Sequence, residues 1–325
     1  MFFEFSCVYA QNSKTGRYYY IGAVGNKPAQ MDVTFDGNQI SGHLYFVNGE
    51  SPLKVDGSVL KNHIKIDTKG PRKISGNMKG KTSRDHTEIN GEWAPLISKK
   101  NKKFHFIKVA EYLKSNIQQG TLISLSAIYP YFIFSNHTGQ LINSKLQDSV
   151  LNRQRSFLKD GQQMNSNNPN ISVGWKQKIS YEITYFSPDL ISIAGNIYLY
   201  TGGAHGITNP LTNNFYINNG RVRQLQLGDL FRPGSTYEEY LSRLCLNNLN
   251  KKGATWIKNG EVTHLAEPDL RHFTISPHGL TFYFPPYMVG PYSDGSFTVD
   301  ISFDSLGDYL DAEGPLQDLL SIPHN

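Results

Sequence analysis

Short β-branched and aromatic segments, separated by turn residues, fill residues 17–94 and limit this part of the chain to an all-β fold. Tyr18–Val24, Ala29–Phe35 and Ile40–Val47 are three such segments, and Asp36-Gly37-Asn38 between two of them is typical of a tight hairpin turn. Turns recur at intervals of about 8–12 residues, as in sandwiches and barrels. The pattern predicts an antiparallel meander or small barrel, because closure removes exposed strand edges.

After residue 105 the pattern becomes mixed, and it predicts an α+β domain in which an antiparallel sheet is accompanied by segregated helices. We expect domains at 1–100 and 101–325. Helices are predicted at 108–118, 141–158, 235–250, 304–311 and 316–321, with a capping box at Ser235 or Thr236. A polar loop is predicted at 162–170. The predicted strands are 121–134, 175–186, 190–200, 214–217, 221–225, 273–275, 280–284 and 297–301.

Charge is distributed unevenly along the chain. Residues 1–104 hold 16 Lys and Arg against 9 Asp and Glu, a net charge of +7, whereas the remainder carries −2. Lysines within Ile97–Phe106 indicate a solvated interdomain linker, with a polyanion-binding patch as the alternative. The excess of basic residues in 1–104 could bind the cell envelope. No recognition motif in the sequence favours binding to nucleic acid.

Several classes of site are not expected from the composition. Two cysteines, Cys7 and Cys245, exclude a disulfide framework; a single bridge between them is left open, although Cys245 lies on a predicted buried helix stripe as a core thiol. We expect no metal and no cofactor, since no metal-ligand or nucleotide-binding motif occurs. No transmembrane segment is expected, and no leader is expected in this sequence.

Two segments are chemically unusual. In the first, Gly202, Gly203 and His205 follow a predicted strand; this is either a ligand-contacting or catalytic loop, or a buried structural turn. The second lies between two predicted strands and carries Pro286, Tyr287, Met288 and Tyr292. Prolines make such a loop stiff, and tyrosines supply contact area at low entropic cost. It is either an exposed binding finger or a loop folded onto its own sheet.

These segments carry a resemblance to a known family. They resemble the signature of the bacterial extracytoplasmic RsiV/PdaC-like family, a domain of unknown function. The matching stretches, in order, are Leu190–Gly206 (ending YTGGAHG), Asn219–Phe231, Phe273–Phe284 and Pro286–Tyr292 (PYMVGPY), while residues 18–94 are similar to a Gly-rich β module that often precedes this domain.

The resemblance implies an extracytoplasmic location, in the periplasm or cell envelope, and a protein or glycan partner. Within the family, RsiV binds lysozyme. This chain lacks a polysaccharide-deacetylase metal motif, and Met288 stands where the family usually has an acidic residue. We therefore expect a non-enzymatic envelope-binding protein that captures a lysozyme-like protein or a cell-wall glycan. The alternative is a cell-wall-modifying hydrolase centred on His205.

Overall fold

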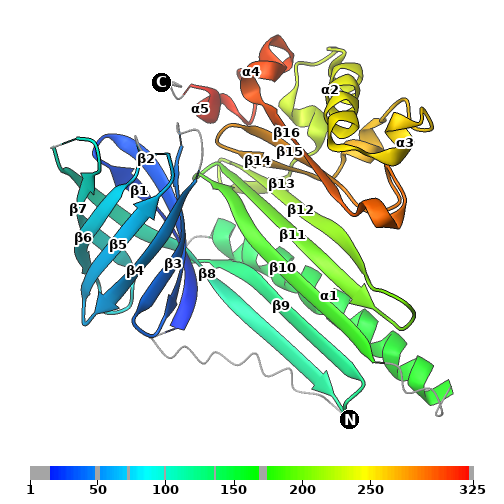
Figure 1. Cartoon of the computed structure of the whole chain (residues 1–325), viewed down its shortest axis with the longest axis horizontal. Helices are drawn as coiled ribbons and strands as arrows, with labels where there is room; N and C mark the ends of the chain where they lie inside the picture. Colours follow the sequence, from blue (N-terminus) through cyan, green and yellow to red (C-terminus); the bar gives the residue numbers. More distant parts are fainter. Residues whose placement is uncertain are drawn as a thin grey trace. The chain divides into compact units, whose positions relative to one another are not determined.

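The computed structural model describes residues 15–47, 52–71, 74–98, 100–134, 137–167 and 174–321 (Figure 1). Among these residues the chain forms two compact units, unit 1 with residues up to 113 and 130–139, and unit 2 with residues 114–129 and 140–321. The fold is α+β and mostly antiparallel, as predicted. The units divide within a single strand, and the domain division at residue 100 stays a prediction.

Unit 1 is an eight-stranded antiparallel barrel, which confirms the predicted small barrel. Each strand pairs with the next, and the last pairs back on the first, from Tyr18 opposite Glu111 to Val24 opposite Phe104. Closure therefore gives each of these eight strands a partner on both sides. The strands are β1 (Thr15–Val24), β2 (Lys27–Asp36), β3 (Gln39–Phe46), β4 (Leu53–Leu60), β5 (His63–Lys69), β6 (Gly76–Thr82), β7 (Glu88–Pro95) and β8 (Lys102–Gln119).

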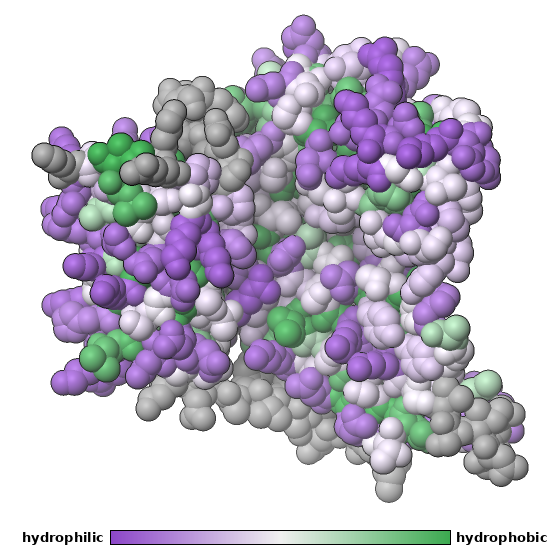
Figure 2. All heavy atoms as spheres, viewed as in Figure 1, coloured by the Kyte–Doolittle hydropathy of each residue, from purple (hydrophilic) through white to green (hydrophobic). Residues whose placement is uncertain are grey.

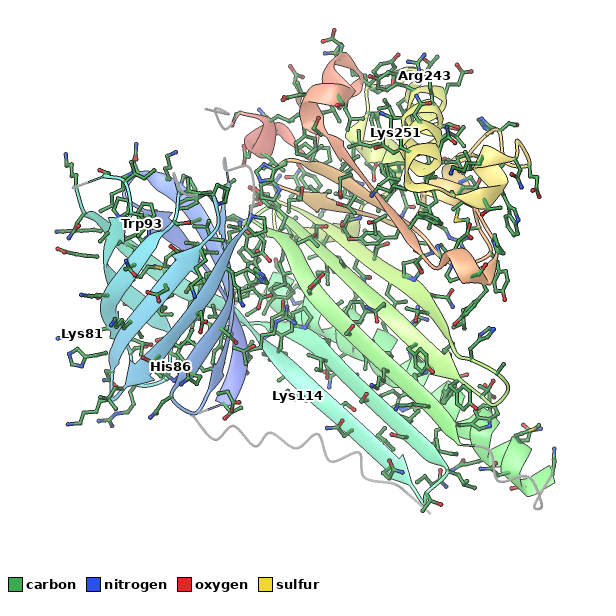
Figure 3. All side chains as sticks on the ribbon, viewed as in Figure 1. Lys81, His86, Trp93, Lys114, Arg243 and Lys251 are labelled. Carbon is green, nitrogen blue, oxygen red and sulfur yellow. The ribbon has the colours of Figure 1, made fainter. Side chains whose placement is uncertain are left out.

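Side chains fill the barrel interior. Successive residues of a strand point to opposite faces, so that in β5 Ile64 and Ile66 are buried while His63 and Lys65 are exposed. The apolar core includes Tyr18, Tyr20, Met31, Phe35, Leu44, Phe46, Trp93, Phe104 and Phe106. Figure 3 labels two residues of this interior, His86 and Trp93, near opposite ends of the barrel.

Both labelled side chains have their polar atoms satisfied. The His86 ring stacks on Phe35 with centroids 4.4 Å apart, and its Nδ1 lies 3.1 Å from the Thr82 hydroxyl. The Trp93 indole Nε1–H donates to Thr68 Oγ1 at 3.3 Å. These bonds let polar groups close an apolar core without loss of hydrogen bonding.

The predictions for residues 97–118 are wrong. Ile97–Phe106 is not an interdomain linker, because Lys102 begins β8 and both Phe104 and Phe106 are buried in the barrel; Lys99 lies outside the described residues. Lys108–Gln118 is not a helix but the continuation of β8. The barrel needs an eighth strand between β7 and β1, and that pairing overrides the weak local helix preference.

Glycines allow the barrel strands to approach closely. Gly80 and Gly91 face each other on β6 and β7. A Cβ on Gly91 would lie 2.2 Å from the carbonyl oxygen of Lys79, and a Cβ on Gly80 would lie 2.0 Å from that of Asn90. Only hydrogen fits at these two positions, so the glycines permit the sharp coiling that closes a small barrel.

We predict that Gly91→Ala lowers the free energy of unfolding of the barrel by about 1–3 kcal/mol, because the added methyl group overpacks backbone that cannot move away easily. Urea unfolding followed by tyrosine fluorescence measures the change. Ser58→Ala, at an exposed position of β4 in the same unit, is the control and should change the value by less than about 0.5 kcal/mol. Equal stability of the two variants would contradict this account of Gly91.

Unit 2 contains a second set of strands covered by a long helix. The elements are β9 (Ile123–Phe132), α1 (His137–Asn167), β10 (Trp175–Phe186), β11 (Leu190–Tyr200), β12 (Ile207–Asn218) and β13 (Arg221–Gln224). β9 and β10 are parallel and are connected through α1, while β10 to β13 are antiparallel neighbours. Helix α1 lies along one face of this sheet, where Phe157 packs with Ile123 and Leu125 (Figure 1).

The polar loop predicted at 162–170 is wrong for its first six residues. Helix α1 extends to Asn167, and residues 168–170 lie outside the described residues. Glutamine is a good helix former, and the Gln162 Nε2 donates to Gln119 Oε1 at 2.8 Å.

The rest of unit 2 is a three-stranded sheet with short helices. Its elements are η1 (Leu227–Leu230), α2 (Tyr237–Lys252), α3 (Thr255–Lys258), η2 (Glu267–Leu270), β14 (Phe273–Ser276), β15 (Gly279–Phe284), η3 (Tyr292–Asp294), β16 (Phe297–Ser302), α4 (Phe303–Leu306), η4 (Gly307–Tyr309) and α5 (Gln317–Leu320). Strand β14 contacts β10, β11 and β12, and α2 contacts β16. No helix of the described chain has the length and hydropathy needed to cross a membrane.

Helix α2 confirms the predicted buried stripe but not the predicted cap. Of the predicted stripe, Leu241, Cys245 and Leu249 are fully buried and Leu244 is half-buried. The helix ends at Lys252, and Gly253 after it has φ of 92°. Thr236 precedes the helix without accepting a capping hydrogen bond, because its ψ of 40° is not the extended conformation that a capping side chain requires. Cys7, the other half of the bridge left open by the sequence, lies outside the described residues.

We predict that Cys245 does not react with thiol reagents in the native protein. Burial raises the pKa of this thiol to about 12, so almost no thiolate forms at pH 8. In a Cys7→Ser variant, Ellman's reagent should titrate about one thiol per chain only after urea is added. Rapid reaction in native buffer would show that Cys245 is accessible.

Candidate functional site

The connection between β11 and β12 forms the first part of the candidate site. Leu199 pairs with Ile207, and residues 201–206 form the short loop between β11 and β12. Gly202 and Gly203 have φ of 103° and 96°, a region of backbone conformation that residues with a Cβ rarely adopt. The Tyr200 hydroxyl donates to the Gly203 carbonyl at 3.1 Å and ties the loop to its strand.

Gly206 lets an aromatic ring lie against this loop. It is buried, and a Cβ on it would lie 2.5 Å from the Tyr198 ring. Tyr198 and Tyr200 are two residues apart on β11 and so share one face of the sheet.

The connection between β15 and β16 forms the second part. Phe284 pairs with Phe297 and closes a loop that begins with Pro285 and Pro286. At its tip, the Tyr287 amide donates to the Gly290 carbonyl at 3.1 Å, and Tyr287 has φ of 68°. A left-handed tyrosine is uncommon and costs free energy.

Contacts with α3 anchor the base of this second loop. Val289 is buried, and its carbonyl accepts from the Trp256 amide at 3.2 Å. The Asp294 carboxylate accepts from the Thr255 amide at 3.0 Å. A Cβ on Gly290 would lie 2.2 Å from Asp294 Oδ2, so glycine is needed for this approach. The loop is therefore fixed at Val289 and Asp294, and Tyr287 is its exposed residue between Pro285 and Gly290.

The two loops meet through aromatic rings. The His205 and Tyr292 rings stack with centroids 3.7 Å apart and planes 16° from parallel. The Tyr292 hydroxyl donates to the Gly206 carbonyl at 2.7 Å, across 86 residues of sequence. Tyr287 lies beside Tyr292, with centroids 5.8 Å apart. We call His205, Tyr287 and Tyr292 the aromatic site.

The predicted site residues differ in exposure. Tyr287 is 54% exposed, and Gly203 and His205 are also exposed. Pro286, Met288, Tyr292 and Gly202 are half-buried. All seven lie on the two loops, and a direct aromatic contact joins one loop to the other.

His205 contacts a backbone carbonyl and an aromatic ring. Its Nδ1 lies 3.3 Å from the Gly206 carbonyl oxygen, and its ring packs on Tyr292. Within the described chain it has no hydrogen bond to a carboxylate or hydroxyl group, which a general base would use to hold its tautomer. No group of three or more His, Cys, Asp or Glu residues in that part of the chain could hold a metal ion.

Sequence reasoning missed the residues that support the site. Asp294 and Val289 anchor the second loop, and Tyr198 packs on Gly206. The alternation of Tyr198 and Tyr200 on a predicted strand could have indicated that these rings share a face. No local pattern could indicate that Asp294 bonds to the start of α3, because 39 residues separate the partners.

Comparison with known proteins gives the chain a family context. Residues 118–208 match a family described as deacetylase PdaC, and residues 228–304 match one described as a protein of unknown function, DUF3298. The later part of this chain is PdaC/DUF3298-like.

The aromatic contact joins the two matched segments of the PdaC/DUF3298-like region. His205 lies in the segment that matches PdaC, and Tyr292 lies in the segment that matches DUF3298. The two segments are therefore in direct contact in this chain.

A curated relative is the peptidoglycan-N-acetylmuramic acid deacetylase PdaC of Bacillus subtilis strain 168, which is 22% identical over 202 residues. The alignment covers 60% of this chain and 42% of that protein, so the chain spans less than half the length of this relative.

Two solved DUF3298 structures are also similar. A protein from Bacteroides fragilis has a TM-score of 0.47 at 19% identity and covers 65% of this chain and 97% of its own. A protein from Pseudomonas aeruginosa has a TM-score of 0.43 at 18% identity and covers 62% of this chain and 94% of its own.

We predict that Tyr292→Phe lowers the free energy of unfolding of unit 2 by about 0.5–1.5 kcal/mol, because it removes the hydrogen bond to Gly206 and leaves that carbonyl unpaired. Tyr287→Phe is the matched control, and since this ring is exposed it should change stability by less than about 0.5 kcal/mol. Chemical denaturation measures both variants. If Tyr292→Phe were as stable as its control, the hydroxyl would not hold the loops together.

Proposed function

We propose that this protein acts at the bacterial cell wall, outside the cytoplasm, and that its PdaC/DUF3298-like region binds a peptidoglycan glycan strand without catalysis. The observation that carries the proposal is the stacked His205–Tyr292 pair with the exposed Tyr287 beside it. Exposed aromatic rings on an anchored loop offer flat apolar area at little entropic cost. Sugar rings have apolar faces that match such surfaces.

The named activity of the relative supports the choice of ligand. PdaC is described as acting on N-acetylmuramic acid in peptidoglycan. Because this chain spans 42% of that protein, we propose for it the same class of ligand, peptidoglycan, but not the deacetylase activity. The site described above has side chains suited to contact and none arranged as a metal centre.

A protein partner is the second candidate. Tyr287 is more than half exposed on a loop that is fixed at Val289 and Asp294. Rigid, protruding tyrosines are common among the residues that dominate protein interfaces. A lysozyme-like protein would be such a partner, and the net charge of −2 on residues 105–325 would attract a basic protein weakly.

The third candidate, a cell-wall-modifying hydrolase centred on His205, has less support. The His205 ring is accessible, but its described hydrogen bond goes to a backbone carbonyl, and it lacks a carboxylate or hydroxyl partner among the described residues. Release of soluble products from peptidoglycan by the wild-type chain, lost in His205→Gln, would favour the hydrolase over the binding protein.

Isothermal titration of the whole chain with a peptidoglycan tetrasaccharide tests the main proposal. We expect Tyr287→Ala to weaken binding about tenfold, since an aromatic contact contributes about 0.5–1.5 kcal/mol beyond its area. His205→Ala should weaken it as well. Tyr45→Ala, a half-buried tyrosine of the barrel, is the control and should leave the affinity unchanged.

The same titration with lysozyme distinguishes the two ligands. A binding heat in the titration with the glycan, and none in the titration with lysozyme, supports the main proposal. Heat with lysozyme alone, reduced by Tyr287→Ala, would replace the glycan by a protein partner. Binding of the glycan at equal strength by wild type and Tyr287→Ala would remove the aromatic site from the proposal.

A further inference from the structure

The register of the barrel places four basic side chains in adjacent positions on its outer face. His63 on β5 lies opposite Lys81 on β6, and Lys65 lies opposite Lys79. All four are exposed. Opposite residues on one face of an antiparallel pair have Cβ atoms about 5 Å apart, and residues two positions along the strand are about 7 Å apart. We call His63, Lys65, Lys79 and Lys81 the basic patch.

Two carboxylates lie near this patch, and neither forms an ion pair with it among the described residues. Asp67 is exposed two residues after Lys65 on the same face of β5. Glu92 lies opposite Lys79 on β7, but its carboxylate accepts from Asn101 Nδ2 at 3.2 Å. Like charges directly opposite each other destabilise a sheet. The arrangement therefore costs stability and leaves its positive charge available to a ligand.

Another lysine pair on the barrel shows the contrast. Lys54 and Lys69 also lie opposite each other, on β4 and β5. There the Lys69 ammonium lies 3.9 Å from the Asp56 carboxylate. This second pair includes an ion pair, whereas no ion pair joins Asp67 or Glu92 to the basic patch among the described residues.

The turns beside the patch extend it. The Asn62 carbonyl accepts from the Thr82 amide at 2.9 Å, so the β4–β5 turn lies next to the end of β6. Lys61 in this turn is exposed with φ of 56°, where Gly or Asn would be less strained. Arg84, in the turn after β6, is exposed as well.

Figures 2 and 3 show the outer face of the barrel. Figure 2 shows hydrophilic side chains over the outer face of the barrel strands. In Figure 3, Lys81 points away from the barrel interior that holds Trp93 and His86.

We propose that the basic patch binds a flexible, phosphodiester-linked polymer of the cell wall. Lysine ammonium groups are compact point charges that suit phosphate oxygens. Three lysine ammonium groups this close together match a chain that carries one anion in every short repeat. A polysaccharide with one carboxylate for each pair of sugar rings is too sparsely charged to reach all three.

The patch lacks the features of a single-stranded nucleic-acid site. Such sites combine a basic groove with aromatic rings on which bases stack. The exposed large apolar residues of the described barrel are Leu60, Leu96, Ile97 and Ile107, and none is aromatic. This inference goes beyond the proposed glycan binding, because it concerns a different surface and a different ligand chemistry.

Binding of poly(glycerol phosphate) to the whole chain, measured by calorimetry at several salt concentrations, tests the proposal. We expect Lys65→Gln with Lys79→Gln to weaken binding at least tenfold at 0.1 M salt and to lower the salt dependence by about two counterions. The matched control is Lys54→Gln with Lys69→Gln, which makes the same change in net charge on the same barrel and should weaken binding less than twofold.

Two further measurements decide the outcome. The melting temperature of Lys65→Gln with Lys79→Gln should equal or exceed that of wild type, because a repulsive pair has been removed, and this excludes unfolding as the cause of lost binding. Equal losses in both double variants would show attraction by net charge alone and overturn the proposal. Tighter binding of DNA than of the polymer would overturn it too. Tyr287→Ala should leave polymer binding unchanged, so the aromatic site and the basic patch are tested separately.

Discussion

The hydrogen bond from the Tyr292 hydroxyl to the Gly206 carbonyl, together with the ring stack above it, is the contact on which the candidate site depends. It joins a glycine-rich hairpin loop to a proline-rich loop from a different sheet. The first loop has glycines at positive φ, which they adopt without strain. The second has Tyr287 at positive φ, which costs free energy. Held together, they place the rings of His205 and Tyr287 each next to Tyr292, so that three rings gather at one site.

In unit 1, the basic patch depends on the strand pairing that closes the barrel. Pairing of β8 with β1 closes the barrel, and the side chains of β5 then alternate between its interior and its exterior. That alternation places His63, Lys65, Lys79 and Lys81 outside, while Ile64 and Ile66 on the same strand fill the core. The basic patch is therefore a consequence of register, which also places Glu92 opposite Lys79.

The two surfaces have different chemistry, and each belongs to its own unit. An aromatic surface suits the apolar faces of sugar rings, and a dense cationic surface suits phosphates. A bacterial cell wall contains polymers of both kinds. The two proposals can stand or fall separately, because no residue is shared between the aromatic site and the basic patch. Either outcome would extend what the partial match to PdaC indicates.

The sequence alone determined the local elements with strong patterns: the β-rich N-terminal part, the hairpins of unit 2, the buried stripe of α2 with Cys245, and the two unusual loops. These are set by periodicity and by turn residues, which act over a few positions. The sequence did not determine β8, which was expected as a linker and a helix, nor the contact of His205 with Tyr292, nor the pairing of Lys65 with Lys79. Only the tertiary structure decided these, because barrel closure and cross-strand register join residues whose separation in sequence carries no local signal.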